Sequence, residues 1–321
     1  MVKILANDGI HPDGKTLFEE AGYQVDTEKI AQADLPGAIG EYDVLIVRSA
    51  TKVTAEVIEA GKNLKIIARG GVGLDNVDVE YAEKKGILVF NTPAASSQSV
   101  AELAFAHMFS LSRFLHQSNR MMPVKGDSDY DKLKKVYSEG VQLRGRTLGI
   151  IGFGRIGQEV ARMGVGMGMH IIANDPFIEE AKIEIKPFNS DNAWLNVRIE
   201  SSDLQELLSK SDFITLHVPF SGGTPIIGKT EFEKMKKGAY LINTSRGGTV
   251  DELALLDALN SGKLAGAGLD VFDFEPKPRA EILQHPKISL TPHIGASTFE
   301  AQENIGLELA DRILAYFGDD K

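Results

Sequence analysis

The chain contains no cysteine and no apolar stretch long enough to cross a membrane. Without cysteine, disulfides, thiolate metal sites and cysteine nucleophiles are excluded, and we expect no metal centre. Apolar stretches such as residues 44–47 are far shorter than the roughly 20 residues that a membrane helix needs. The first strand pattern runs straight into polar Asn7 and Asp8, without a signal core or cleavage pattern. We therefore expect a cytoplasmic protein with no membrane partner.

Basic residues are also in deficit, with 35 lysines and arginines against 45 aspartates and glutamates, a net charge of −10. An acidic surface repels the phosphodiester backbone, so we expect no nucleic-acid partner. Apolar residues make up 43% and charged residues 25% of the 321 positions. This balance is typical of a globular protein, and the length favours two domains.

Short strand patterns alternate with helical patterns along the whole chain, which predicts an α/β protein with parallel sheets. The strands expected in the first lobe are 2–6, 23–25, 44–47, 65–68 and 87–90. Those expected in the second lobe are 148–151, 170–173, 213–217, 239–242, 265–270 and 288–290. Six strands with intervening helices fit a doubly wound, Rossmann-type dinucleotide-binding domain.

Four further segments complete the pattern. Residues 100–115 form a long apolar helical pattern, whereas 121–140 and 177–200 are weakly patterned. We interpret 121–140 as a connector or interaction segment and 177–200 as a loop or insertion. The last pattern, 297–316, predicts a helix capped by Ser297. Its apolar residues at a spacing of four are Ala301, Ile305, Leu309 and Ile313.

A glycine fingerprint directly follows the predicted strand 148–151 and opens a helical pattern. In such a motif the first glycine permits a tight turn, the second lets the backbone approach a pyrophosphate, and the third lets helix and strand pack closely. The helix N-terminus supplies free N–H groups to the phosphates. The alternative is a glycine-rich turn that binds no nucleotide. The residues expected to bind the cofactor here are Gly152, Gly154, Arg155, Ile156 and Gly157.

Asp175 lies at the end of the next predicted strand, 18 residues after Gly157. A carboxylate at this place accepts hydrogen bonds from the adenosine ribose hydroxyls and repels a 2′-phosphate. No arginine follows immediately. The sequence therefore predicts NAD as the cofactor in preference to NADP.

Three polar residues follow predicted strands of the second lobe, where open α/β sheets place their ligands: Arg246, Glu275 and His293. Hydride transfer from an alcohol needs a base for the hydroxyl proton, and histidine titrates nearest to neutral pH. A neighbouring carboxylate orients the imidazole and raises its pKa. A guanidinium holds a substrate carboxylate with two hydrogen bonds. Alone, each residue is more typical of a surface or cap, and together they predict a catalytic set.

The order of these motifs resembles the D-isomer-specific 2-hydroxyacid dehydrogenase family across essentially the whole chain. The resemblance implies that His293 is the acid/base, Glu275 its partner and Arg246 the substrate anchor. It places Asp270 on the nicotinamide carboxamide. It also implies that Thr244, with His217 and Pro219, lines the nicotinamide and its ribose.

The resemblance also implies the domain organisation. Residues 1–97 with 294–321 would form a discontinuous, flavodoxin-like substrate domain, and 98–293 the Rossmann NAD-binding domain. Family members dimerise through the cofactor lobe and the segment near 98–145, so we expect a homodimer. The chain runs 28 residues past His293, which leads us to expect no C-terminal regulatory domain.

Two N-terminal motifs, residues 47–54 and 68–78, resemble the D-3-phosphoglycerate dehydrogenase branch of the family. Each places an arginine, Arg48 or Arg69, after or at the end of a predicted strand, and two guanidiniums suit a doubly charged phosphate. Val72 and Gly73 lie in a glycine-rich turn whose N–H groups can bind a carboxylate. The alternative is that both arginines pair with surface acids.

The resemblance thus implies NAD-dependent oxidation of D-3-phosphoglycerate to 3-phosphohydroxypyruvate, the first step of serine biosynthesis, with a phosphorylated hydroxy acid as the partner. A hydroxypyruvate or glyoxylate reductase of the same family is an alternative. An alternative of another class is an NAD-sensing, corepressor-like binding protein, since folds and sites are reused.

Overall fold

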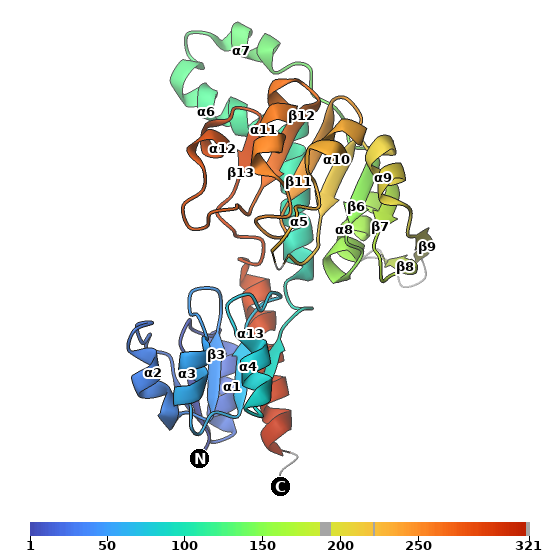
Figure 1. Cartoon of the computed structure of the whole chain (residues 1–321). Helices are drawn as coiled ribbons and strands as arrows, with labels where there is room; N and C mark the ends of the chain where they lie inside the picture. The colour runs from blue at the N-terminus through green and yellow to red at the C-terminus, as the bar shows by residue number, and fades with distance from the viewer. Residues whose placement is uncertain (187–193, 221, 319–321) are drawn as a thin grey trace. The chain divides into compact units, whose positions relative to one another are not determined.

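The computed structural model describes residues 1–186, 194–220 and 222–318. Contacts within the chain divide it into two units, each built on its own parallel sheet (Figure 1). Unit 1 joins Met1–Ser99 to Ala296–Lys321, and unit 2 is Val100–Gly295. Over the described residues, no helix combines the length and the apolar character that a membrane span requires.

Unit 1 contains a five-stranded sheet in the order β2-β1-β3-β4-β5, with all neighbours parallel. This 2-1-3-4-5 order is that of flavodoxin-like folds, so the expected class of this lobe is confirmed. Its strands are β1 (Lys3–Ala6), β2 (Gln24–Asp26), β3 (Val44–Val47), β4 (Ile66–Arg69) and β5 (Leu88–Asn91).

The strands of unit 1 are apolar on both faces because helices cover both sides of the sheet. In β3, Val44 and Ile46 pack into one core, and Leu45 and Val47 pack into the other. Helices α1 (Pro12–Glu20) and α13 (Phe299–Gly318) cover the first face (Figure 1). The second face is covered by α2 (Leu35–Ala38), the short helix Ile39–Glu41, α3 (Ala55–Ala60) and α4 (Val79–Lys84).

The last helix, α13, completes the core of unit 1. Its buried residues include Ile305, Leu309 and Ile313, as the spacing of four predicts. The predicted cap is wrong by one residue, because the hydroxyl of Thr298 rather than Ser297 accepts the N–H of Ala301 at 3.1 Å. The helix accordingly begins at Phe299.

Unit 2 contains a six-stranded parallel sheet in the order β13-β12-β11-β10-β6-β7. The chain order reverses between β6 and β10, and ligands of open α/β sheets bind at such a switch point, beyond the carboxyl ends of the strands. The strands are β6 (Thr147–Ile151), β7 (His170–Asn174), β10 (Phe213–Leu216), β11 (Ala239–Asn243), β12 (Leu264–Leu269) and β13 (Ile288–Leu290). All six predicted strands of this lobe are present.

Helices again cover both faces of the sheet (Figure 1). One face carries α5 (Ser97–Ser112) and α8 (Arg155–Gly166). The other carries α9 (Leu204–Lys210), α10 (Lys229–Lys234), α11 (Glu252–Asn260) and α12 (Ala280–Gln284). The segment interpreted as a connector, 121–140, contains the end of α6 (Leu115–Lys125) and the whole of α7 (Tyr130–Val136), and α6 buries none of its residues.

The stretch interpreted as a loop or insertion differs from that expectation. Its described residues form two antiparallel strands, β8 (Glu180–Ile185) and β9 (Leu195–Glu200). Ile183 and Ile199 are buried and join the core beneath α8. Directly after β9, Ser201 forms a parallel β-bridge with Ala173 of the edge strand β7.

Candidate active site

The turn after β6 is built on glycines for steric reasons. Gly152 has a φ of +90°, and a Cβ there would lie 2.5 Å from the carbonyl oxygen of His217. A Cβ on Gly157 would lie 2.1 Å from the carbonyl oxygen of Gly152. Around Gly154, by contrast, nothing lies within 4 Å of an added Cβ. The turn is therefore packed tightly at two glycines and leaves the backbone open at the third.

Helix α8 begins at this open position. Arg155 is exposed and Ile156 is half-buried in its first turn. The first N–H groups of a helix have no partner within it, and they carry the positive end of the helix dipole. The start of α8 is therefore suited to a phosphate group.

Asp175 directly follows β7 and reaches back to the glycine turn. Its Oδ2 accepts the N–H of Phe153 at 2.7 Å, and its Oδ1 accepts those of Phe177 at 2.9 Å and Ile178 at 3.2 Å. The carboxylate thus fixes the turn against the end of β7. Each carboxylate oxygen can accept more than one hydrogen bond, so hydroxyl groups can still bind there.

Two buried polar atoms lie at the ends of the neighbouring strands β10 and β11. The Nδ1 of His217 and the hydroxyl of Thr244 have no hydrogen-bond partner among the described residues. The Nε2 of His217 lies 2.9 Å from the Thr215 hydroxyl, and burial lowers the pKa of His217 to about 3, so its ring is neutral. Pro219, two residues on, is exposed. Buried polar atoms are normally paired, so these two atoms fit a polar ligand at the switch point.

A dinucleotide fits these features. The open backbone at Gly154 and the start of α8 suit a pyrophosphate, and Asp175 suits ribose hydroxyls. The unpaired atoms of His217 and Thr244 suit the polar groups at the other end of the ligand.

His293 and Glu275 form a hydrogen-bonded pair, with 2.8 Å between Nδ1 and Oε2. The other carboxylate oxygen, Oε1, accepts the N–H of Phe272 at 2.9 Å. The hydrogen bond to Glu275 raises the pKa of His293 above its ordinary value, although burial opposes the shift. Burial is the largest single effect on the pKa of Glu275 and would raise it, but the bond and charge of His293, the N–H of Phe272 and the charge of Arg246 together lower it.

The pairing also fixes the tautomer of His293. An ionised carboxylate only accepts hydrogen bonds, so Nδ1 carries the proton that lies toward Glu275. Nε2 is therefore the nitrogen that can take up or release a proton at physiological pH.

Asp270 is buried behind His293 and holds the loop that carries it. Its Oδ1 accepts the Thr291 hydroxyl at 2.6 Å and the N–H of Ile294 at 2.9 Å, and its Oδ2 accepts the N–H of Gly295 at 2.9 Å. Burial raises the pKa of Asp270, and these three hydrogen bonds oppose the rise. The side chain is thus a structural anchor of the loop, and the resemblance had suggested only a cofactor contact.

Arg246 lies in a loop that Asn243 shapes. The Nδ2 of Asn243 donates to the carbonyl of Arg246 at 3.1 Å and to the Thr249 hydroxyl at 2.9 Å, and its Oδ1 accepts from Ser245. Arg246 lowers the pKa of both His293 and Glu275, which places its charge close to the pair. An asparagine at a strand end is a known turn signal, but sequence reasoning did not use it.

A second support joins the loops of Arg246 and Glu275. Asp273 accepts the N–H of Gly248 at 2.8 Å, and its own N–H donates to Glu252 at 3.0 Å. Glu252 is buried and pairs with Arg279 at 3.2 Å. Burial raises the pKa of Glu252. Sequence reasoning missed this network because its members come from three separate loops and helices.

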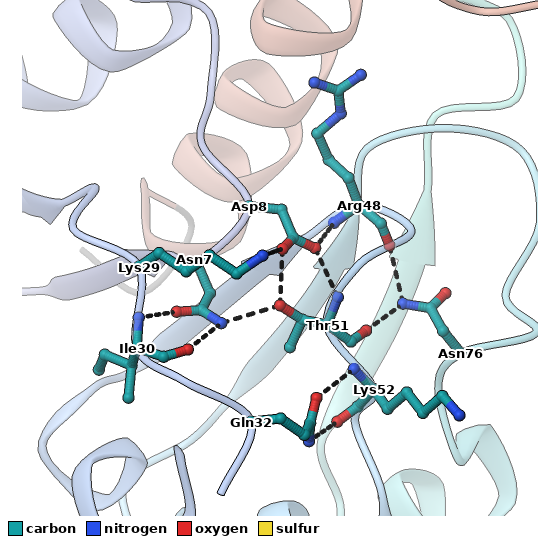
Figure 2. Close-up of polar contacts among 9 residues, drawn as sticks. All are labelled: Asn7, Asp8, Lys29, Ile30, Gln32, Arg48, Thr51, Lys52 and Asn76. Carbon is teal, nitrogen blue, oxygen red and sulfur yellow. Dashed lines mark hydrogen bonds and ion pairs between the residues drawn. The ribbon is translucent and has the colours of Figure 1, made fainter. Parts of the chain in front are cut away.

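In unit 1, Arg48 follows β3, and its backbone is held from two sides (Figure 2). The carboxylate of Asp8 accepts the N–H of Arg48 at 2.8 Å, and the side chain of Asn76 donates to its carbonyl at 2.8 Å. Asp8 also accepts the N–H and the hydroxyl of Thr51, and with Lys29 these bonds lower its pKa against the effect of burial. The guanidinium extends away from this network in Figure 2.

The space beside Arg48 is a pocket of about 280 Å³ within unit 1. Asp8, His11, Arg48 and Gln302 are among the residues that line it. Its wall therefore presents a guanidinium, an imidazole and an amide, all of which can hydrogen-bond to an anion.

Arg69 ends β4, beside the end of β3, since Val47 is its partner in the parallel register. A Cβ on Gly71 would collide with the Arg69 guanidinium, and Gly71 has a φ of +134°. Val72 and Gly73 are half-buried, and the side chain of Asn91 donates to the carbonyl of Val72. The four predicted substrate residues thus gather at the carboxyl ends of adjacent strands of unit 1.

The predicted site residues form two groups. Those predicted to serve catalysis and cofactor binding all lie in unit 2, at the carboxyl ends of its strands. Those predicted to bind substrate, apart from Arg246, lie in unit 1.

Comparison with known proteins identifies the family. Residues 105–295 match the family described as D-isomer specific 2-hydroxyacid dehydrogenase, NAD binding domain. The hydroxypyruvate reductase of Thermotoga maritima is 44% identical over 321 residues, 98% of each chain. The D-3-phosphoglycerate dehydrogenase of Methanocaldococcus jannaschii is 43% identical over 98% of this chain, which spans 57% of that protein. The D-lactate dehydrogenase of Aquifex aeolicus, solved with NAD and lactic acid, superposes with a TM-score of 0.74 at 29% identity, covering 100% of this chain and 96% of that one.

The chain belongs to the D-isomer-specific 2-hydroxyacid dehydrogenase family. It is an enzyme, an NAD-dependent oxidoreductase of D-2-hydroxy acids. The resemblance drawn from the sequence motifs is confirmed at this level, as is the cofactor.

Proposed function

We propose that the enzyme oxidises D-3-phosphoglycerate to 3-phosphohydroxypyruvate. The observation that carries the proposal is the pair Arg48 and Arg69, at the carboxyl ends of adjacent strands in unit 1. A phosphate with two negative charges is bound best by guanidiniums, whose N–H groups match its oxygens. The pocket beside Arg48 adds further donors in the same unit.

The proton transfer is assigned to His293. Its Nδ1 is engaged by Glu275, so Nε2 would take the proton of the substrate hydroxyl during oxidation and return it during reduction. Glu275 stabilises the imidazolium that forms, because the carboxylate lies 2.8 Å from Nδ1.

Arg246 is assigned to the carboxylate that all 2-hydroxy acids share. Asn243 and Thr249 fix its backbone, so the guanidinium is presented from a braced loop. During reduction, the positive charge of Arg246 would stabilise the negative charge that develops on the carbonyl oxygen of the 2-oxo acid. The residues that would hold NAD are the glycine turn, Asp175, His217 and Thr244, and NAD when bound accepts the hydride from C2 of the substrate.

The second candidate is reduction of hydroxypyruvate. It is favoured by the Thermotoga maritima relative, which matches this chain over 98% of both lengths, whereas the phosphoglycerate dehydrogenase of Methanocaldococcus jannaschii is matched over 57%. The two functions share the proton chemistry of His293 and differ in whether unit 1 must bind a phosphate.

Substrate preference after loss of Arg48 separates the two candidates. Each charge-assisted contact to phosphate contributes about 1.5–3 kcal/mol, so Arg48→Ala should lower kcat/KM for 3-phosphoglycerate by roughly ten- to a hundred-fold. The same substitution should change kcat/KM for hydroxypyruvate and glyoxylate only slightly. Arg246→Ala should impair every substrate, and Lys52→Ala, which removes an exposed charge near Arg48, should impair none.

Steady-state kinetics on 3-phosphoglycerate, 3-phosphohydroxypyruvate, hydroxypyruvate, glyoxylate and pyruvate provide the measurement. If Arg48→Ala reduces activity equally with phosphorylated and unphosphorylated substrates, the arginine is structural and the phosphoglycerate assignment fails. If the wild type prefers hydroxypyruvate to 3-phosphohydroxypyruvate, the second candidate replaces the first.

A further inference from the structure

His107 is a buried histidine of α5 that the proposed chemistry does not use. Its side chain is 2% exposed, and its two ring nitrogens have partners in β13 and directly after it: Nδ1 lies 3.0 Å from the Ser289 hydroxyl and Nε2 lies 3.0 Å from the Thr291 hydroxyl. The helix can approach the sheet this closely because residue 268 of β12 is glycine. A Cβ on Gly268 would lie 2.7 Å from the Cβ of His107.

The hydrogen-bond partners fix the proton on the ring. The Thr291 hydroxyl donates to Asp270 at 2.6 Å, so it can only accept from His107, and Nε2 must carry the proton. Nδ1 is then the acceptor that faces the Ser289 hydroxyl at 3.0 Å, and the Ser110 hydroxyl at 3.3 Å is the other partner of that hydroxyl. Burial lowers the pKa of His107 to about 4, which agrees with a neutral ring. The chain of donors therefore runs from His107 through Thr291 to Asp270.

Asp270 in turn controls the backbone of His293. His293 has a φ of +54°, in the left-handed region that residues with a Cβ seldom occupy. The two N–H groups that follow it, of Ile294 and Gly295, both donate to the carboxylate of Asp270. A strained backbone persists only where its surroundings hold it, and these bonds hold it directly after the strained residue.

We propose that His107 is a positioning residue for His293, acting through Thr291 and Asp270. By donating to Thr291 it orients the hydroxyl that donates to Asp270 Oδ1, and so keeps that carboxylate turned toward the two amides. The inference rests on the proposed role of His293 as the acid/base. Its effect is on geometry, so it should appear in kcat rather than in substrate binding.

The test compares four single variants in the full chain, and one double variant built from two of them. His107→Met removes both ring nitrogens and keeps an apolar side chain of similar length, whereas His107→Gln retains an N–H donor near the position of Nε2. Thr291→Val removes the next hydroxyl at nearly constant volume. Leu111→Met is the matched control, since Leu111 also packs from α5 onto a glycine of β12, Gly266, without contacting the chain of donors.

Kinetics with NADH and a 2-oxo acid give the first readout. We expect His107→Met and Thr291→Val each to lower kcat roughly tenfold or more, with little change in KM, because small displacements of a reacting group are costly. His107→Gln should recover most of the loss, and Leu111→Met should resemble the wild type. The double variant of His107→Met and Thr291→Val should be no worse than either single variant, because the two residues act in one chain.

Hydrogen exchange at the amides of Ile294 and Gly295 gives a second readout that does not depend on activity. We expect their protection to fall at least tenfold in His107→Met and to be unchanged in Leu111→Met. Unchanged protection and kcat in a folded His107→Met variant overturn the inference, as do additive losses or a failure of His107→Gln to recover. An inactive wild type, or an active His293→Asn variant, refutes the proposed function instead, while the exchange data still decide the role of His107.

Discussion

At the scale of single residues, His293 depends on two carboxylates with separate effects. Glu275 bonds to its ring and sets the tautomer and the pKa, whereas Asp270 bonds to the following amides and sets the backbone. A histidine in the left-handed region presents its ring from a turn rather than from a strand. The chemistry of the imidazole and its direction are thus controlled by different side chains.

The pH dependence of activity should reveal the role of Glu275. Reduction requires protonated His293, whose pKa is raised mainly by the bond to Glu275, so wild-type kcat/KM for a 2-oxo acid should decline only above pH 6.5. In Glu275→Gln the pKa of His293 should fall, so kcat/KM for the 2-oxo acid should begin to decline at a lower pH. Oxidation needs the neutral imidazole, so the variant should keep more of its oxidation activity than the wild type as the pH is lowered. Glu281→Gln, an exposed carboxylate on α12, serves as the control. Identical pH profiles for Glu275→Gln and the wild type would contradict the assignment.

Cofactor preference should depend on Asp175. Replacing this residue with alanine removes the acceptor expected at the ribose, so KM for NAD should rise about tenfold or more, and the preference over NADP should weaken. Asp175→Asn keeps the shape of the side chain and removes its charge. Comparing the asparagine and alanine variants therefore separates the repulsion of a 2′-phosphate from the support that the side chain gives to the glycine turn. The measurement is kcat/KM with both cofactors. Equal wild-type efficiency with NAD and NADP would show that the ribose assignment is wrong.

Residues with a recognisable local context could be predicted, and those that act between loops could not. Arg246, Glu275 and His293 each follow a strand pattern in a short motif, so sequence alone singled them out as candidates. The side chain of Asn243 bonds to side chains and backbone two to six positions further along, and its local turn signal was not used. His107, by contrast, acts through a contact that only the fold creates, with Ser289, 182 positions away. No local pattern encodes such a contact.

At the scale of elements, buried strands were predicted well and exposed ones were not. The parallel strands are covered on both faces and appear as short apolar runs, as β3 does with all four residues buried. In β8 and β9 only Ile183 and Ile199 are buried, and charged side chains fill much of the rest. Their pairing depends on a partner strand rather than on a local apolar run, so the pattern was too weak to identify.

Helix α8 offers a matched pair of glycines for a stability test. Gly157→Ala places a Cβ 2.1 Å from the carbonyl oxygen of Gly152, so the helix must move away from the turn, and we expect a loss of about 1–3 kcal/mol in unfolding free energy with weaker NAD binding. Gly166→Ala, at the end of the same helix, meets nothing within 4 Å and should be neutral or stabilising by up to about 1 kcal/mol. Chemical denaturation and NAD titration provide the measurements. Equal stabilities of the two variants would refute the packing argument.

At the scale of the whole molecule, we expect the chain to form a homodimer through the segment near 98–145. Helices α6 and α7 expose several apolar side chains: Leu115, Met122, Val124, Tyr130 and Val136. Clusters of exposed apolar residues mark interaction surfaces. A charge introduced into this surface would be tolerated if the chain were a monomer, because it would stay in water, and would be unfavourable if the surface were buried in a dimer interface.

Sedimentation at micromolar concentration should give twice the chain mass of 34.9 kDa. Val136→Glu should weaken association at least tenfold, because an unpaired charge would be buried in the interface. Leu253→Glu on α11 is the control, as Leu253 and Val136 are both 57% exposed. A wild type that sediments only as a monomer would remove the expectation.

The discontinuity of unit 1 has a consequence for synthesis on the ribosome. The strands β1 to β5 are made before unit 2, yet one face of their sheet is covered in part by Ile305, Leu309 and Ile313 of α13, which are made after unit 2. Unit 2 has all of its strands before α13 emerges. We therefore expect unit 2 to complete its fold before unit 1, the reverse of the usual order in which the N-terminal domain folds first. Until α13 emerges, the nascent chain carries an apolar sheet with one face partly uncovered, and we expect it to need protection from aggregation most in that interval.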